Sequence, residues 1–201
     1  MKIKLSILLL FMIQITNLYS EEYHKGIYYT INGEKVEGLI SVQKTQLSAI
    51  YFRPCVLKFK KNNNSKPIKL DNMNISSFVI KNDSFAVVQN FKVMFYMGTF
   101  KGFFWGKCRR DFAKVLQQGK ISSFELPCNV FLGQYGYQDY SYIILTKDNQ
   151  NFRVFDLKKE KERQALIEFF SNIEELKNTI QNTNYKEIDL IKMVNLYNNK
   201  Y

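Results

Sequence analysis

Apolar and polar residues alternate through the middle of the chain, and this alternation predicts a body built from β-strands. Two such runs in 27–42 flank Asn32-Gly33, a pair that readily adopts the two positive φ angles of a type I′ turn. In 56–60 two apolar residues alternate with lysines, which directs one face of a strand inward and the other into water. The pattern therefore favours antiparallel hairpins over parallel βαβ units.

Further strands are predicted at 47–52, 68–70, 78–80, 85–89, 91–96, 121–126, 142–146 and 151–155. Polar turns separate several of them: the lysine- and asparagine-rich tip 60–66, the pair Asn82-Asp83, and the run Asp148-Asn149-Gln150. Short strands joined by turns at this spacing predict a sheet, a sandwich or a roll.

A different pattern interrupts the strands at 107–120. Phe112, Val115 and Leu116 fall on one face of a helix, and Gly119 stands where the glycine that follows a helix C-terminus is found. This segment is predicted to be one short internal helix.

The chain changes character after Asp156, where the apolar residues recur at helical spacing. They form three stripes: Leu166, Phe169, Phe170 and Ile173; Leu176 and Ile180; and Leu190, Ile191, Val194 and Tyr197. Asn184 followed by Glu187 matches a variant of the capping box that begins a helix. We expect an α+β fold, with an antiparallel β-rich body over 21–156 and a C-terminal helical segment over 157–201 packed on it. The alternative for these helices is docking on another protein.

Residues 1–20 have the layout of a secretory signal peptide. A basic Met-Lys-Ile-Lys start precedes an apolar run over 5–13, broken only by Ser6, and a polar stretch ends at Ser20. The apolar run is about half of the roughly 20 residues that a transmembrane helix needs. We expect cleavage near Ser20 and export to the periplasm, the outer-membrane periphery or the exterior, with no transmembrane span in the mature chain. An uncleaved membrane anchor is the alternative.

Composition limits the chemistry and suggests the charge of a partner. The chain has 201 residues, 46% of them hydrophobic, which is ample for one ordinary core. Loss of Lys2 and Lys4 lowers the basic count from 29 to 27 against 18 acidic residues, so the mature chain carries a formal charge of +9. Such a surplus favours anionic surfaces. Of the 29 basic residues of the full chain, 24 are lysine and five are arginine. Arginine is the residue that makes bidentate hydrogen bonds to phosphates and base edges, so its scarcity leads us to expect no nucleic-acid partner.

Residue types that carry catalysis are few. His24 is the single histidine, and no nucleotide-binding or nucleophile-elbow motif occurs, so we expect no cofactor and no metal. Cys55, Cys108 and Cys128 allow three pairings or three buried thiols. The competing interpretation is a polysaccharide hydrolase that uses paired carboxylates. Its candidate residues are Asp139, Asp148 and Asp156.

Two aromatic segments are candidate binding surfaces. The first, 91–105, ends in Phe103, Phe104 and Trp105 and is followed by the cations Lys107, Arg109 and Arg110. This composition suits an interface where rings enter a partner and cations meet anionic head groups or glycans, although a core strand with a tight crossing would also explain it. The second, 131–142, contains Tyr135, Tyr137 and Tyr140 among glycines and glutamines, and it fits either a stacking surface for sugars or a peptide, or an ordinary loop at a sheet edge.

Several short motifs occur in an order that carries a resemblance. They are the leader, GIYYTINGEKVEGLI at 26–40, IYFR at 50–53, LQQGKI at 116–121 and IDLIKMVNLYN at 188–198. Taken together, the chain resembles uncharacterised exported proteins common in Bacteroidota. The resemblance implies a β-rich body with a helical tail that ends near a Tyr-Asn pair, and it brings no activity, cofactor or catalytic residue. We therefore expect a non-catalytic binding or structural module for an anionic lipid, a glycan or an envelope protein.

Overall fold

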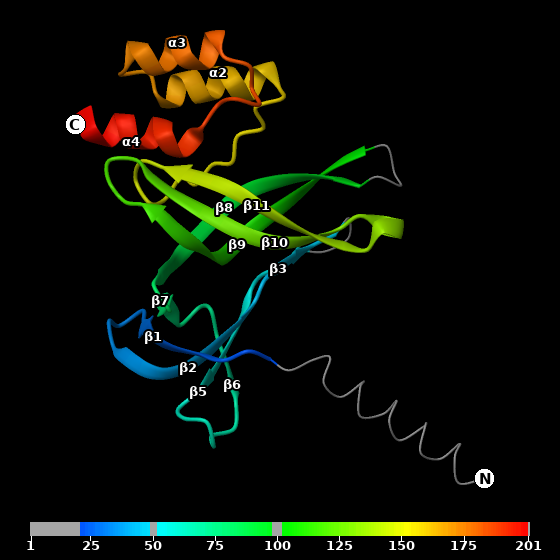
Figure 1. Ribbon diagram of the computed structural model, residues 1–201, viewed down its shortest axis with the longest axis vertical. Helices are drawn as coiled ribbons and strands as arrows, with labels where there is room; N and C mark the ends of the chain where they lie inside the picture. The colour runs from blue at the N-terminus through cyan, green and yellow to red at the C-terminus, as the bar shows by residue number, and fades with distance from the viewer. Residues whose placement is uncertain (1–20, 49–51, 98–101, 201) are drawn as a thin grey trace.

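The computed structural model describes residues 21–48, 52–97 and 102–200, and the fold is α+β, with a β-rich body and helices mainly at the C-terminal end (Figure 1). The strands are β1 His24–Thr30, β2 Lys35–Gln43, β3 Thr45–Leu47, β4 Phe52–Arg53, β5 Val56–Lys60, β6 Ile68–Leu70, β7 Ile75–Ile80, β8 Asp83–Met97, β9 Gly102–Gln117, β10 Ser122–Phe131 and β11 Tyr137–Thr146. The helices are the 3₁₀ turn η2 Gly133–Tyr135, α2 Glu160–Phe169, α3 Glu174–Asn182 and α4 Leu190–Lys200.

The strands form one curled sheet in the order β4-β3-β10-β9-β8-β7-β1-β2-β5-β6, with β11 added on β10. Neighbouring strands are antiparallel except for β3 and β10, which are parallel. The long strands β8 and β9 pair along most of their length and connect the two ends of the body. Figure 1 shows β1, β2, β5 and β6 at one end and the three α-helices stacked over the other.

The sheet forks at β10. One edge of β10 pairs with β11 from end to end, whereas the other pairs first with β9, up to Glu125, and then with β3, from Cys128. Pro127 lies between the residues of β10 that pair with β9 and those that pair with β3. The ladder needs no N–H donor at this position, so proline is tolerated there. The fork lets one strand take part in two differently oriented regions of the sheet.

Three apolar clusters follow from this curl. The first lies inside β1, β2, β5 and β7 and includes Ile40, Phe59 and Phe78. The second lies between the β8–β9 hairpin and β10–β11 and includes Phe91 and Leu126. The third joins the helices to the sheet, where the faces of all three α-helices pack on Ile121, Leu145 and Phe155. The helical segment is therefore packed against the β-rich body.

A side-chain clasp fastens α4 to the sheet. The Asn198 amide accepts a hydrogen bond from the Ile121 N–H at 2.9 Å and donates one to the Ile121 carbonyl at 2.8 Å, as a neighbouring strand would. Gly119 is needed beside it, because a Cβ there would lie 2.6 Å from the Asn198 side chain. The tyrosine before the clasp, Tyr197, is buried against Phe170.

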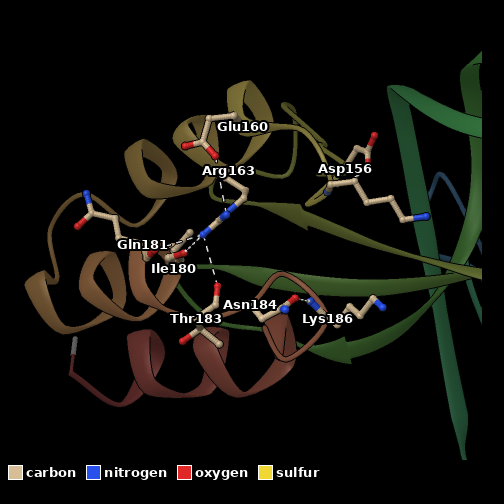
Figure 2. Close-up of polar contacts among 9 residues, drawn as sticks. Asp156, Glu160, Arg163, Ile180, Gln181, Thr183, Asn184 and Lys186 are labelled. Atoms are coloured by element: carbon tan, nitrogen blue, oxygen red, sulfur yellow. Dashed lines mark hydrogen bonds and ion pairs between the residues drawn. The ribbon is translucent and has the colours of Figure 1, made fainter.

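Arg163 fastens α2 to the end of α3 (Figure 2). Its Nη2 lies 2.7 Å from the Ile180 carbonyl, 3.3 Å from that of Gln181 and 3.4 Å from that of Thr183. The last carbonyls of a helix have no partner within it, and a cation there also matches the negative end of the helix dipole. Arg163 thus satisfies the C-terminus of α3 from a neighbouring helix.

The internal helix predicted at 107–120 is wrong, because this segment lies in strand β9 and the turn that follows it. The apolar spacing of this segment resembles that of a helix because both faces of β9 are covered: Phe112 packs in the first cluster and Ala113 in the second. A strand buried on both sides has no period of two, and a short run of this kind resembles a helical face. Gly119, predicted to follow a helix, instead makes room for Asn198.

Several local predictions also change. The runs 85–89 and 91–96 form one strand, β8, in which Asn90 has a φ of 55°. The segment 151–155 forms only an isolated bridge between Arg153 and Leu145. The predicted strand 47–52 is interrupted, and its residues 49–51 lie outside the described residues. Of the hairpin turn, Gly33 alone has a positive φ, 83°, so the turn is not type I′ although the hairpin is confirmed.

The start of the last helix was predicted at the wrong residue. Asp189, rather than Asn184, caps α4, since its Oδ1 accepts hydrogen bonds from the N–H groups of Ile191 and Lys192, both at 3.0 Å. Asn184 instead accepts from the Lys186 N–H in the preceding turn (Figure 2). Strands 56–60 and 68–70 are confirmed with the predicted bounds.

Candidate ligand-binding groove

The aromatic residues of the first predicted binding surface lie at the outer end of the β8–β9 hairpin. In the backbone register Phe103, Phe104 and Trp105 face Tyr96, Phe95 and Met94, and the side chains of all six lie outside the described residues. These residues are therefore placed only by strand and register.

The three cations that follow have different surroundings. Lys107 and Arg109 are exposed on β9. Arg110 points to the body instead: its Nε donates to the Asn72 carbonyl at 2.9 Å and its Nη2 to that of Ile75 at 3.0 Å. Arg110 therefore holds the β6–β7 connection in place, while its two basic neighbours on β9 remain at the surface.

The predicted tyrosine surface lies on the neighbouring β10–β11 hairpin. Tyr135, Tyr137 and Tyr140 are 63%, 48% and 46% exposed, respectively. Tyr135 belongs to the 3₁₀ turn, whereas the other two lie on β11. All three rings are at the surface of one hairpin tip, and the Tyr137 ring also packs against Phe131, with centroids 5.2 Å apart.

A groove of about 590 Å³ lies on the opposite end of the body, over β1, β2 and β7. Ile27, Leu39 and Val79, all half-buried, supply apolar lining. The ammonium groups come from three different places in the chain: Lys25 on β1, Lys61 after β5, and Lys81 in the β7–β8 turn. Asn62, Asn63 and Glu37 complete the polar lining. We call this site the lysine-rimmed groove.

Two glycines allow the strands beneath the groove to approach closely. Gly26 and Gly38 face each other across the β1–β2 ladder. A Cβ on Gly26 would lie 2.6 Å from the Val79 carbonyl oxygen, and one on Gly38 would lie 2.4 Å from the Phe59 ring. Larger residues at these positions would push apart the strands that shape the groove. A glycine inside a strand often marks such an approach, and this was the only local sequence feature that could have indicated the site.

The backbone of Lys81 is held in an unfavourable conformation. Its φ is 56°, in the left-handed region that suits glycine or asparagine. A residue with a Cβ pays about 1 kcal/mol to remain there. Strain of this kind persists where the surrounding structure fixes it and is frequent at binding sites. Lys81 is the first of the two residues that join β7 to β8, and the tight turn fixes its backbone at the rim of the groove.

The lysines of the groove are not neutralised by nearby acids. Within the described ranges, none of Lys25, Lys61 and Lys81 forms an ion pair, and Glu37, the acid in the lining, pairs with Lys35 at 2.5 Å. In the adjacent hollow of about 370 Å³ the acids have partners of their own, for example Asp83 with Lys114 at 2.7 Å. The lining of the groove thus carries a surplus of positive charge, with three lysines and one glutamate.

A buried carboxylate that the sequence interpretation missed lies at the fork of the sheet. Asp111 is 0% exposed. It accepts hydrogen bonds from the Thr45 hydroxyl at 2.5 Å, the Cys55 N–H at 3.0 Å and its neighbour's N–H, that of Phe112, at 2.8 Å. Burial raises the pKa of Asp111 although these donors act against the rise. Asp111 thereby ties β9 to β3 and to the start of β5.

The three cysteines are buried free thiols. Burial raises the pKa of Cys128 to about 12, and it also raises the pKa values of Cys55 and Cys108. A thiol is nucleophilic only as the thiolate, so these cysteines are held in their unreactive form. They act as small apolar residues around the fork.

The three aspartates of the hydrolase alternative are separated or occupied locally. Asp139 is near the start of β11 and pairs with Lys44 at 2.9 Å, whereas Asp148 follows its end. The strand between them spans about 23 Å at roughly 3.3 Å per residue, far beyond the 5–10 Å that glycosidases use. Asp148 accepts turn hydrogen bonds that lower its pKa, and Asp156 lies 3.6 Å from Lys159.

Comparisons with known proteins found no match: no family model, no curated protein and no solved structure matches the chain. Within the described part of the chain, no helix has the length and apolarity to cross a bilayer. No group of three metal-binding side chains occurs in those residues either.

Proposed function

We propose that the protein is exported and acts as a non-catalytic binding module of the cell envelope, and that its lysine-rimmed groove binds an anionic ligand. The observation that carries this proposal is the placement of Lys25, Lys61 and Lys81 around an apolar lining. An amphiphilic anion matches both parts, since its charge meets the ammonium groups while its apolar portion covers half-buried aliphatic side chains. The volume of about 590 Å³ lies in the range of small-ligand sites.

The chemistry of the lining favours an anionic head group over a sugar face. The residues that line the groove include no aromatic ring, and stacking on aromatic rings is the usual way in which sugars and bases are held. Lysine acts as a compact point charge that suits a phosphate or carboxylate. An anionic envelope lipid is therefore the first ligand to test, followed by an acidic glycan.

Export is supported by the leader at 1–20, whose basic start, short apolar run and polar end are typical of signal peptides. The surplus of basic residues supports the charge of the partner, because a strongly positive protein is attracted to anionic surfaces. Both features are independent of the groove: the leader supports the compartment, and the basic surplus supports an anionic partner.

The experiment compares binding to vesicles of phosphatidylglycerol and of phosphatidylcholine by co-sedimentation. We expect binding to the anionic vesicles only, with a loss of affinity as salt rises. Replacing Lys25, Lys61 and Lys81 together by alanine should weaken binding about 100-fold, since each lysine near an anionic surface contributes about 1 kcal/mol. An acidic polysaccharide, tested in parallel with the same variants, distinguishes a lipid from a glycan.

The matched control replaces Lys107 and Arg109, the exposed cations of β9, by alanine in an otherwise unchanged chain. This variant should retain nearly all binding if the groove is the site. Losses of binding free energy in proportion to the charges removed, three in one variant and two in the other, would mean that net charge alone drives association, and the groove would not be the site. Binding that does not respond to salt would refute the electrostatic basis of the proposal.

A further inference from the structure

The sheet protects two of its strand edges and leaves a third accessible. β4, described over Phe52–Arg53, is followed by Pro54, and β6 has three residues and is preceded by Pro67. Short length and proline are standard ways to prevent an edge strand from pairing with another chain. β11 has ten residues, no proline, and a ladder to β10 without a register shift.

The direction of the backbone groups of β11 follows from a single contact. Leu145 exchanges two hydrogen bonds with Arg153, both at 2.9 Å, on the side away from β10. Because alternate residues of a strand direct their N–H and C=O groups to the same side, Ser141 and Asp139 also direct theirs away from β10. Pro127 agrees with this assignment, because it lies opposite Ser141 in the register, where β10 needs no N–H toward β11.

The outer part of β11 is exposed on both of its faces. All four residues from Gln138 to Ser141 are exposed, whereas Ile144 and Leu145 are fully buried. In the described part of the chain, β11 pairs with β10 on one side and with Arg153 at one point on the other. The open stretch is centred on Tyr140, which is 46% exposed.

We propose that β11 pairs antiparallel with β11 of a second copy of this chain, about a two-fold axis at Tyr140. The axis places Tyr140 opposite Tyr140 of the second copy. On either side of this pair, Asp139 of one copy lies opposite Ser141 of the other. These last two pairs exchange four backbone hydrogen bonds, because both residues direct their backbone groups outward. The two Tyr140 rings then form a cross-strand aromatic pair, which stabilises a sheet.

Charge favours this register over the one centred on Asp139. A two-fold axis normal to the sheet must pass through a pair of identical residues. Centred on Asp139 it would place two carboxylates opposite each other, which is unfavourable. Centred on Tyr140 it places each carboxylate opposite a serine, while Lys44 stays beside Asp139 at 2.9 Å. The occupant that complements this edge is therefore the edge itself.

Net charge gives the dimer a salt dependence opposite to that of the groove. The formal charge is +11 for the full chain and +9 after the expected loss of Lys2 and Lys4, so two copies repel each other at low ionic strength in either form. Added salt screens this repulsion. Dimerisation should therefore strengthen with salt while anion binding in the groove weakens, and either proposal can fail without the other.

The test is sedimentation velocity of the full chain from about 1 to 200 μM, a range that covers weak, specific association. We expect a concentration-dependent dimer that is favoured at high salt. Ser141→Pro should weaken association at least about tenfold, since proline removes an outward N–H and leaves the ladder to β10 intact. Ser141→Ala keeps the N–H and should associate like the parent chain.

A second variant covers the case in which Ser141→Pro perturbs folding. Tyr140→Lys places two ammonium groups opposite each other, and Tyr140→Phe retains both rings, so the first should dissociate the dimer and the second should not. A parent chain that remains monomeric at 200 μM in high salt would overturn the proposal. So would a dimer that persists in both Ser141→Pro and Tyr140→Lys, because the interface would then lie elsewhere.

Discussion

The two ends of the molecule use their charged and polar side chains differently. At the helical end Arg163 binds three carbonyls at the end of α3, and Asn198 binds both backbone groups of Ile121. At the opposite end Lys25, Lys61 and Lys81 surround the groove and form no ion pair within the described residues. Polar groups at the first end are used to hold the chain together, whereas those at the second remain available for a ligand.

The difference indicates where substitutions should change stability and where they should change binding. Between the two ends lies the fork, where Asp111 is fully buried and bound by β3, β5 and its own strand. A substitution there should affect both ends, one in the helical layer should loosen that layer, and one in the groove should act chiefly on ligand affinity.

The largest effect is expected at the fork. Asp111→Ala leaves the Thr45 hydroxyl and two buried N–H groups without an acceptor, so we expect a loss of about 3 to 5 kcal/mol in the free energy of unfolding. Urea denaturation measures it. The control Asp139→Ala removes an exposed carboxylate and should cost less than about 1 kcal/mol. Equal losses in the free energy of unfolding for the two variants would show that the buried hydrogen bonds of Asp111 do not stabilise the fork.

The Asp111 carboxyl should also make the free energy of unfolding depend on pH. Because burial raises the pKa of Asp111 in the folded chain, the unfolded chain releases this proton first, near pH 4. The Asp111 contribution to stability is therefore fully present below that pH and falls as pH rises through the folded pKa. In Asp111→Asn this fall should be absent, so the difference between the two stability curves measures it.

A smaller effect is expected in the helical layer. Arg163→Met keeps the aliphatic part of the side chain and removes the donors to the end of α3, which should cost about 2 kcal/mol. Amide hydrogen exchange should show faster exchange in α3 and α4 while β1 and β2 remain protected. Arg153→Met is the matched control, since this arginine is exposed and only covers the Phe155 ring. Slower exchange in the groove strands than in α3 is the expected contrast.

The smallest effect on stability has the opposite sign. Lys81→Gly removes the strain of a φ of 56° and should stabilise the chain by about 1 kcal/mol, while it removes one ammonium group from the groove. Thermal unfolding and vesicle binding, measured together, should therefore change in opposite directions. A variant that loses stability would show that the backbone of Lys81 is not strained.

The strands that sequence analysis located well are those with local determinants. In 56–60 and 68–70 the alternation lies within a few residues and a polar tip separates the two strands, so their bounds were predictable. The segment 107–120 was not, because its pattern depends on two cores that cover opposite faces of β9. Only tertiary packing distinguishes such a strand from a helix.

The groove could not be located from the sequence for a related reason. Its lysines are separated by 36 and 20 positions in the chain, and the strand order brings them together. Asp111 was equally hidden, since nothing near it in the sequence indicates the distant Thr45 and Cys55 that bind it. The aromatic segments were recognisable as candidate surfaces because their unusual residues are adjacent in the sequence.

The clasp between Asn198 and Ile121 joins residues 77 positions apart. During synthesis the strands emerge before α4, so the apolar surface around Ile121, Leu145 and Phe155 is fully covered only when the last residues have been added. Contacts of such long range form late. Until α4 has formed, this apolar surface of the sheet lacks part of its cover.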